Sequence, residues 1–258
     1  MSETAAGGLV ATALFFGTLA LLEVGRRIRQ HQRRQHGEGV GVGVGPVEGA
    51  AFGLMSLLLA FTFSGAASRF DSRRELIGAE ANAIGTVYQR LDLLEPAARP
   101  ALQQKLRSYV DARLALYHAG KDRDRVRLAQ AQVAGLQREI WERAVEAVRS
   151  APVPNVAVPL LPAVNEMTDA AATRAVTSLI HPPLIVYLLL GMVSLMCALM
   201  AGYSMGARES RSWLHMIGFA AVFAVTFYVI VDLEYPRLGL FRITEFDRVL
   251  VELRAGMR

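Results

Sequence analysis

AAFGLMSLLLAFTFSGAASRFDSRRELIGAEANAIGTVYQRLDLL, residues 50–94, changes character partway along without a break. Its first third is apolar and about long enough to cross a bilayer. The remainder carries Arg, Asp and Glu at helical spacing, and the whole run contains no proline. We therefore predict one helix that starts in lipid and continues into water as a charged rod. Several such helices, packed side by side in an oligomer, can line a pore.

Apolar residues are concentrated in four blocks of the chain. They make up 53% of all residues, although 20% of the residues are charged. Each block approaches the roughly 20 residues that a membrane-spanning helix needs, and the blocks are residues 8–25, 50–67, 183–206 and 212–231. The first block lacks the basic start and the small-residue cleavage site of a secretory signal, so we interpret it as a retained anchor. The chain is thus predicted to be a four-span, multi-pass membrane protein.

Residues 68–182 form the only sizeable aqueous part, and their pattern is helical throughout. Three apolar stripes mark the expected core: Leu76, Ala83, Ile84, Val87, Leu91 and Leu94; then Leu102, Leu106, Tyr109, Val110 and Tyr117; then Val126, Val133, Leu136, Ile140, Ala144 and Val148. The prolines of residues 151–162 predict an extended connector, and a last helix is expected near residues 163–180. The predicted fold class is all-α.

Four parts follow along the chain. Residues 1–49 hold the first transmembrane helix and a basic linker, whose alternating Gly and Val at residues 39–46 predict mobility. Residues 50–94 hold the second transmembrane helix and its continuation into water. Residues 95–182 form an extramembrane helical domain between the second and third spans. Residues 183–258 supply the third and fourth transmembrane helices and a C-terminal segment.

No signature of catalysis appears in the sequence. It has no HExxH, Walker A loop, GxSxG elbow or GxGxxG. The five histidines are scattered and the single cysteine is Cys197, so neither a metal site nor an internal disulfide is predicted. We expect no catalytic residue and no cofactor, and hence no enzyme. The net charge of +5, with arginines interleaved among acids, favours contact with membrane lipids and disfavours nucleic acid.

One face of the long helix changes from apolar to polar along its length. Steps of three and four residues from Leu57 place these side chains in a line or close to it: Leu57, Phe61, Ser64, Ser68, Glu75, Asn82 and Thr86, with Asp71 or Ser72 between Ser68 and Glu75. A ring of such helices would form a hydrophobic neck at Leu57 and Phe61 that opens into a polar vestibule. The alternative is that this face only packs on lipid or on neighbouring helices, because any amphipathic helix has such a face.

The run SLLLAFTFSGAASRFDSRRELIGAEANAIG resembles the second membrane helix of bestrophins. It is still more similar to a bacterial bestrophin-like family, long known as a domain of unknown function. PAVNEMTDAAATRAV (residues 162–176), HPP (residues 181–183) and VDLEYPRLGLFRI (residues 231–243) also resemble later blocks of that family. The resemblance covers nearly the whole chain in four-span order, and it implies a bacterial inner (plasma) membrane protein.

The resemblance further implies a homopentameric channel for ions, with its pore lined by the second helix and its neck at Gly53, Leu57 and Phe61. Gly53 departs from the family pattern, since bestrophins have a bulky apolar residue there. The acidic cluster of the bestrophin calcium clasp is also absent, which argues against calcium gating.

Ion choice and membrane orientation stay open at this point. Asp71, Glu75 and Glu80 in the vestibule would favour cations, whereas the arginines at 69, 73 and 74 would favour anions, and we lean to cations. Arginines in the short loops place the helical domain outside the cytoplasm, whereas the resemblance places it inside. Two functions compete: an oligomeric ion channel, and a non-conducting membrane scaffold or sensor that presents a helical domain to partners.

Overall fold

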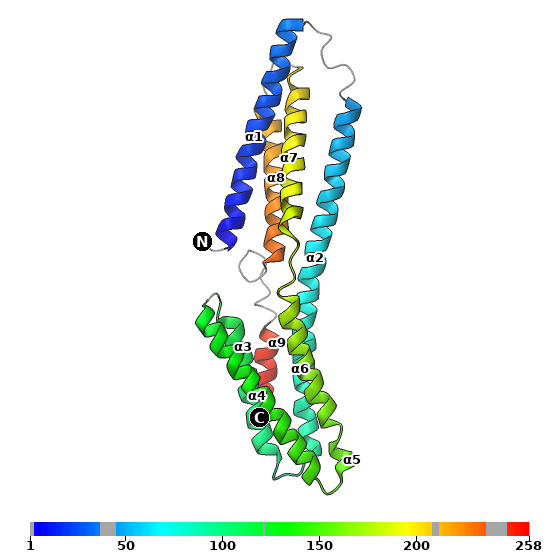
Figure 1. Ribbon diagram of the computed structural model, residues 1–258, viewed down its shortest axis with the longest axis vertical. Coiled ribbons are helices and arrows are strands. Elements are labelled where there is room, and N and C mark those ends of the chain that lie inside the picture. The colour runs from blue at the N-terminus through cyan, green and yellow to red at the C-terminus, as the bar shows by residue number, and fades with distance from the viewer. Residues whose placement is uncertain (1–2, 37–44, 121, 208–211, 236–246, 258) are drawn as a thin grey trace. The chain divides into compact units, whose positions relative to one another are not determined.

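The computed structural model consists of helices and short connections (Figure 1). It describes residues 3–36, 45–120, 122–207, 212–235 and 247–257, and no strand occurs within these ranges. Four helices are long and apolar enough to cross a membrane: α1 (Glu3–His36), α2 (Gly45–Arg90), α7 (Leu184–Met205) and α8 (Trp213–Glu234). The predicted all-α class with four spans is confirmed. Residues 39–44 of the expected Gly/Val linker lie outside the described residues.

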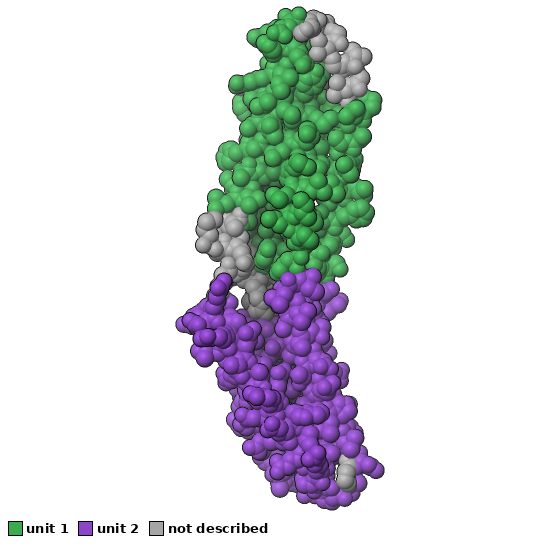
Figure 2. Space-filling view, viewed as in Figure 1, with its two compact units in different colours: residues 1–70, 181–242 green, residues 71–180, 243–258 purple. Residues whose placement is uncertain are grey.

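The chain divides into two compact units, coloured separately in Figure 2. The membrane unit comprises residues 1–70 and 181–242, and the helical unit comprises residues 71–180 and 243–258. Helix α2 supplies residues to both units, as its apolar first part and charged second part predict.

Within the membrane unit, α1 packs against α7 and α8 (Figure 1). The α1–α7 contact depends on two glycines that let the backbones touch. A Cβ atom at Gly202 of α7 would overlap the carbonyl oxygen of Leu22, and one at Gly25 of α1 would overlap that of Leu199. Small residues allow this close approach where lipid offers no hydrophobic drive for helix association.

Replacing Gly202 with alanine is therefore expected to lower the melting temperature of the detergent-solubilised protein. Neither backbone can yield easily, and overpacking typically costs about 1–3 kcal/mol. The matched control is Gly191→Ala on the same helix, where a Cβ would meet no atom within 4 Å. Equal melting temperatures for the two variants would contradict this account of the α1–α7 contact.

The helical unit has a continuous apolar core. It is built by the second part of α2, the short 3-10 helix η1 (Leu91–Leu93), α3 (Arg99–His118), α4 (Arg123–Ser150), α6 (Leu160–Thr177) and α9 (Arg248–Gly256). The three stripes expected from the sequence supply most of it, with Ile84, Leu106 and Ile140 each almost fully buried. Because these side chains recur at helical spacing, burying them fixes the faces by which the helices pack.

The connector expected at residues 151–162 differs from the prediction. It contains the single-turn helix α5 (Pro154–Ala157), and α6 begins at Leu160, before the expected start at 163. Proline is tolerated in the first turn of a helix, where its missing N–H has no intrahelical partner in any case. Pro154 and Pro162 both occupy such positions, so the prolines shorten the connector and do not abolish helix there.

Candidate functional site

The predicted neck residues lie on a side of α2 that the rest of the chain does not cover. Gly53 is exposed, the Leu57 side chain is 51% exposed and the Phe61 side chain is 68% exposed. Other faces of the same segment are covered, as at Met55 and Ala66, which pack in apolar clusters of the membrane unit. An apolar stripe is thus left for lipid or for another protein surface.

The polar residues predicted to follow the neck are also exposed. They are Ser64, Ser68, Asp71, Glu75 and Asn82. Together with the three neck residues they form what we call the exposed α2 face. Asp71 accepts a bond of 3.1 Å from the Arg74 guanidinium one turn further along. Glu75 makes no ion pair within the described part of the chain, so its carboxylate contributes a full negative charge to this face.

The three arginines that follow the apolar segment are each engaged elsewhere. The Nε atom of Arg69 donates to Oε1 of Glu234 on α8 at 2.6 Å. Arg73 is only 6% exposed and donates to the carbonyl oxygen of Ile180 at 2.9 Å. Arg74 pairs with Asp71. Their positive charges are therefore compensated or turned inward, which the sequence pattern could not indicate.

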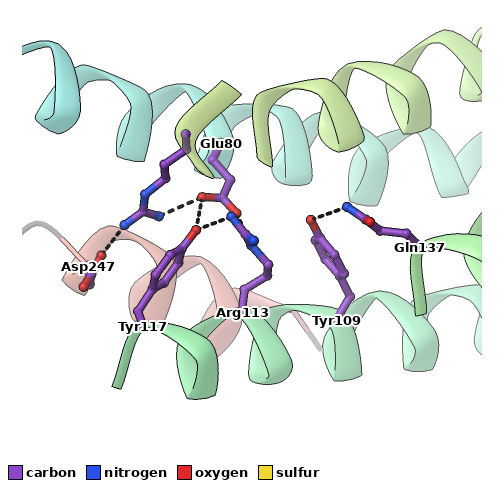
Figure 3. Close-up of polar contacts among 7 residues, drawn as sticks. Glu80, Tyr109, Arg113, Tyr117, Gln137 and Asp247 are labelled. Carbon is purple, nitrogen blue, oxygen red and sulfur yellow. Dashed lines mark hydrogen bonds and ion pairs between the residues drawn. The ribbon is translucent and has the colours of Figure 1, made fainter. Parts of the chain in front are cut away.

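Glu80 contradicts its predicted place in a vestibule, because it is fully buried in the helical unit. Figure 3 shows its carboxylate between Arg113 and Tyr117 of α3. Nε of Arg113 donates to Oε1 at 2.5 Å, and the Tyr117 hydroxyl donates to Oε2 at 2.7 Å. Nη1 of Arg174 on α6 donates to Oε2 at 2.7 Å. A carboxylate held by three donors in a covered position does not line an ion path.

We call this group the buried charge network, and Asp247 completes it. Nη2 of Arg174 donates to Asp247 at 2.7 Å, next to the start of α9. The Arg174 guanidinium also lies over the Tyr117 ring, 3.7 Å from its centroid. The positive charges of Arg113 and Arg174 equal in number the negative charges of Glu80 and Asp247. Such pairing offsets the cost of burying charged side chains.

Burial and the neighbouring arginines shift the pKa of Glu80 in opposite directions. Burial alone would raise the pKa of Glu80, but the hydrogen bond and charge of Arg113, aided by Arg174, bring it below its ordinary value of 4.5. Burial raises the pKa of Tyr117, and it raises the pKa of Tyr109 to about 12. Tyr117 therefore keeps its proton at neutral pH and can donate it to Glu80.

The sequence contained a signal for this network that periodicity arguments passed over. Arg113 falls four residues after Tyr109, in the middle of an apolar stripe, and Arg174 falls three after the buried Ala171. A charged residue at a core position of an amphipathic helix requires a buried partner of opposite charge. Which partner it finds depends on the tertiary fold.

No group of three or more His, Cys, Asp or Glu side chains in the described ranges could hold a metal ion. The membrane unit has an apolar groove lined by residues of α1, α7 and α8, such as Leu14, Met192 and Phe227. Its lining is almost wholly apolar.

Comparison with known proteins gives one family and one fold. A family model described as Bestrophin-like domain matches residues 12–246. The chain is similar to crystal structures of a bacterial Bestrophin homolog from Klebsiella pneumoniae. For one single-residue variant the TM-score is 0.70 at 13% identity, covering 95% of this chain and 98% of that chain. For another structure of that homolog the TM-score is 0.65 at 14% identity, and the match covers 92% of this chain and 97% of that chain. No curated protein sequence matches.

Proposed function

This chain belongs to the bestrophin-like family and is a membrane protein, and from that premise we propose that it is an ion channel whose pore is lined by the exposed α2 face. The channel is a homo-oligomer of the bacterial inner membrane, with five copies as the bestrophin resemblance implies. The observation that carries the proposal is a face of α2 that is exposed along its length, apolar from Gly53 to Phe61 and polar from Ser64 to Asn82.

Lipid alone explains only half of that face. A lipid-facing surface would account for the exposure of Leu57 and Phe61, but it gives no role to the polar residues that continue the same face. A central axis shared by several copies accounts for both parts, because water and ions there meet an apolar constriction and then hydroxyls and carboxylates. Such constrictions gate by dewetting.

The preference for cations rests on Glu75. Because the nearby arginines are paired or turned inward, the net charge presented by the face is negative. A ring of acids raises the local concentration of cations and excludes anions. The vestibule of this proposal therefore consists of Ser64, Ser68, Asp71, Glu75 and Asn82, without Glu80.

Glu75→Gln is expected to reduce the permeability ratio of K⁺ to Cl⁻ severalfold. The change removes one uncompensated negative charge per subunit and keeps the side-chain size. Reversal potentials under a KCl gradient measure the ratio. Asp71→Asn is the matched comparison and should have a smaller effect, since Asp71 is already paired with Arg74. A larger effect at Asp71 than at Glu75 would refute this assignment.

The channel itself is tested with purified protein in liposomes and in detergent. We expect flux of K⁺ that requires the protein, and a detergent-corrected mass of five chains by native mass spectrometry. A monomer would exclude the shared axis. Absence of current across several salts, from protein that is folded and oligomeric, would instead favour the non-conducting scaffold.

A further inference from the structure

A histidine lies close to a buried carboxylate at the C-terminal end of α8. Nδ1 of His181 lies 3.6 Å from Oε2 of Glu234, and the imidazole ring stacks on Tyr235 with centroids 4.9 Å apart. Glu234 is fully buried, and its other oxygen accepts from Arg69 of α2. The separation exceeds a hydrogen-bond length, yet it is short enough for an ion pair once the ring is charged.

The Arg69 side chain lies over a residue without a side chain. A Cβ atom at Gly65 would lie 3.2 Å from Nη1 of Arg69. The guanidinium therefore lies back along α2, over Gly65, to reach Glu234. This places the Arg69–Glu234 pair beside Ser68 in the sequence, the last hydroxyl of the exposed α2 face.

Helices α2 and α8 carry further charged groups close to His181 or Glu234, in space or in the sequence. Helix α2 contributes Arg69 and also Arg73, which donates to the carbonyl oxygen of Ile180, the preceding residue. Helix α8 contributes Glu234 and the buried Asp232, to which Tyr228 hydrogen-bonds. Glu234 contacts both the Arg69 guanidinium, which stays charged, and the His181 imidazole, which gains a positive charge when it takes up a proton. The ring is 32% exposed, so solvent protons can reach it.

We propose that His181 is a proton-sensing residue that reduces cation flux at acid pH by competing with Arg69 for Glu234. The inference rests on the proposed pore. With a neutral imidazole, Glu234 serves the Arg69 guanidinium. When His181 takes a proton from solvent, the same carboxylate serves two cations, and the cluster gains one positive charge. The additional positive charge next to the polar part of α2 repels the cations that Glu75 attracts.

The experiment compares K⁺ flux into liposomes at about pH 7.5 and about pH 5.5, the range over which imidazole changes charge. Wild-type flux should fall severalfold at the lower pH. His181→Gln should keep its flux at both values, and His181→Arg should be low at both. These opposite effects distinguish a charge from a merely structural role.

His215→Gln is the matched control, because His215 lies at the other end of α8 with Ser212 as its partner. It should retain the wild-type pH response. A response that survives in His181→Gln but disappears in His215→Gln would overturn the proposal.

A second measurement separates failure of the switch from failure of the channel. The difference between the melting temperatures of the wild type and His181→Gln should increase in favour of the wild type as pH falls. The reason is that the new ion pair forms only with a charged ring. If that difference is present but no preparation conducts, the proposed function fails although the cluster titrates. If flux is present and the melting difference is absent, the proton-sensing role fails by itself.

Discussion

Glu80→Ala is expected to destabilise the helical unit by about 3–5 kcal/mol, the usual consequence of removing one partner of a buried ion pair. Arg113 and Arg174 would both lose their shared carboxylate while remaining almost fully buried. Only Asp247 would be left to compensate two guanidinium charges. Loss of several kcal/mol from a domain whose total stability is about 5–15 kcal/mol should produce a large fall in melting temperature and rapid limited proteolysis.

The control for Glu80 is Glu75→Ala, five residues earlier on the same helix. Glu75 is exposed and outside any described ion pair, so its loss should leave stability almost unchanged while altering ion selectivity. The pair of variants therefore separates folding from conduction. Similar melting temperatures for both variants would show that the buried charge network is not essential for the stability of the helical unit.

The lowered pKa of Glu80 fixes the sign of its pH dependence. Its stabilising effect is fully present above the ordinary value of 4.5 and is lost as pH falls through the lower value of the folded protein. Wild-type stability should therefore decline more steeply below about pH 4.5 than that of Glu80→Gln, which has no proton to gain there. Chemical denaturation at a series of pH values measures the difference.

Hydropathy and helical periodicity were sufficient for much of this fold. The four spans follow from length and composition, since a membrane leaves few alternatives to apolar helices of about 20 residues. The core stripes of the helical unit follow from spacing, and side chains such as Ile84 and Ile140 are buried as expected. Leu57 and Phe61 are exposed on α2, and their place in a pore neck stays a prediction.

What the sequence could not supply is pairing between distant segments. Acidity alone places Glu80 with Glu75 in the predicted vestibule. However, five residues correspond to a rotation of about 140° around a helix. That rotation carries Glu80 onto the covered side. Arg113 and Arg174 come from other helices, 33 and 94 positions away. The same reason explains why the sequence did not show that Arg69 and Arg73 turn inward. Their partners, Glu234 and Ile180, are remote from them in the sequence.

Phe61→Ala is expected to increase single-channel conductance severalfold. The ring is the largest apolar group on the exposed α2 face, and Phe61 is 68% exposed. In a ring of subunits, each phenylalanine would narrow the path and expel water from it, and ions cross a dry constriction only at a large desolvation cost. Alanine both widens the path and lowers its apolar surface. Because a barrier reduction of about 1.4 kcal/mol corresponds to a tenfold rate, even partial wetting should be measurable.

Phe63→Ala provides the matched control two residues away. Phe63 is also exposed, at 44%, but two residues correspond to about 200° around the helix, so it points away from the proposed path. Its replacement should leave conductance unchanged, as recorded in planar bilayers under the same salt. Phe61→Trp should act in the opposite direction to Phe61→Ala, because a larger ring narrows the same constriction. If the Phe63 variant alone alters conductance, the pore must be lined by a different face of α2, and the assignments of Leu57, Ser64, Ser68 and Glu75 fail with it, since all of them share the register of Phe61.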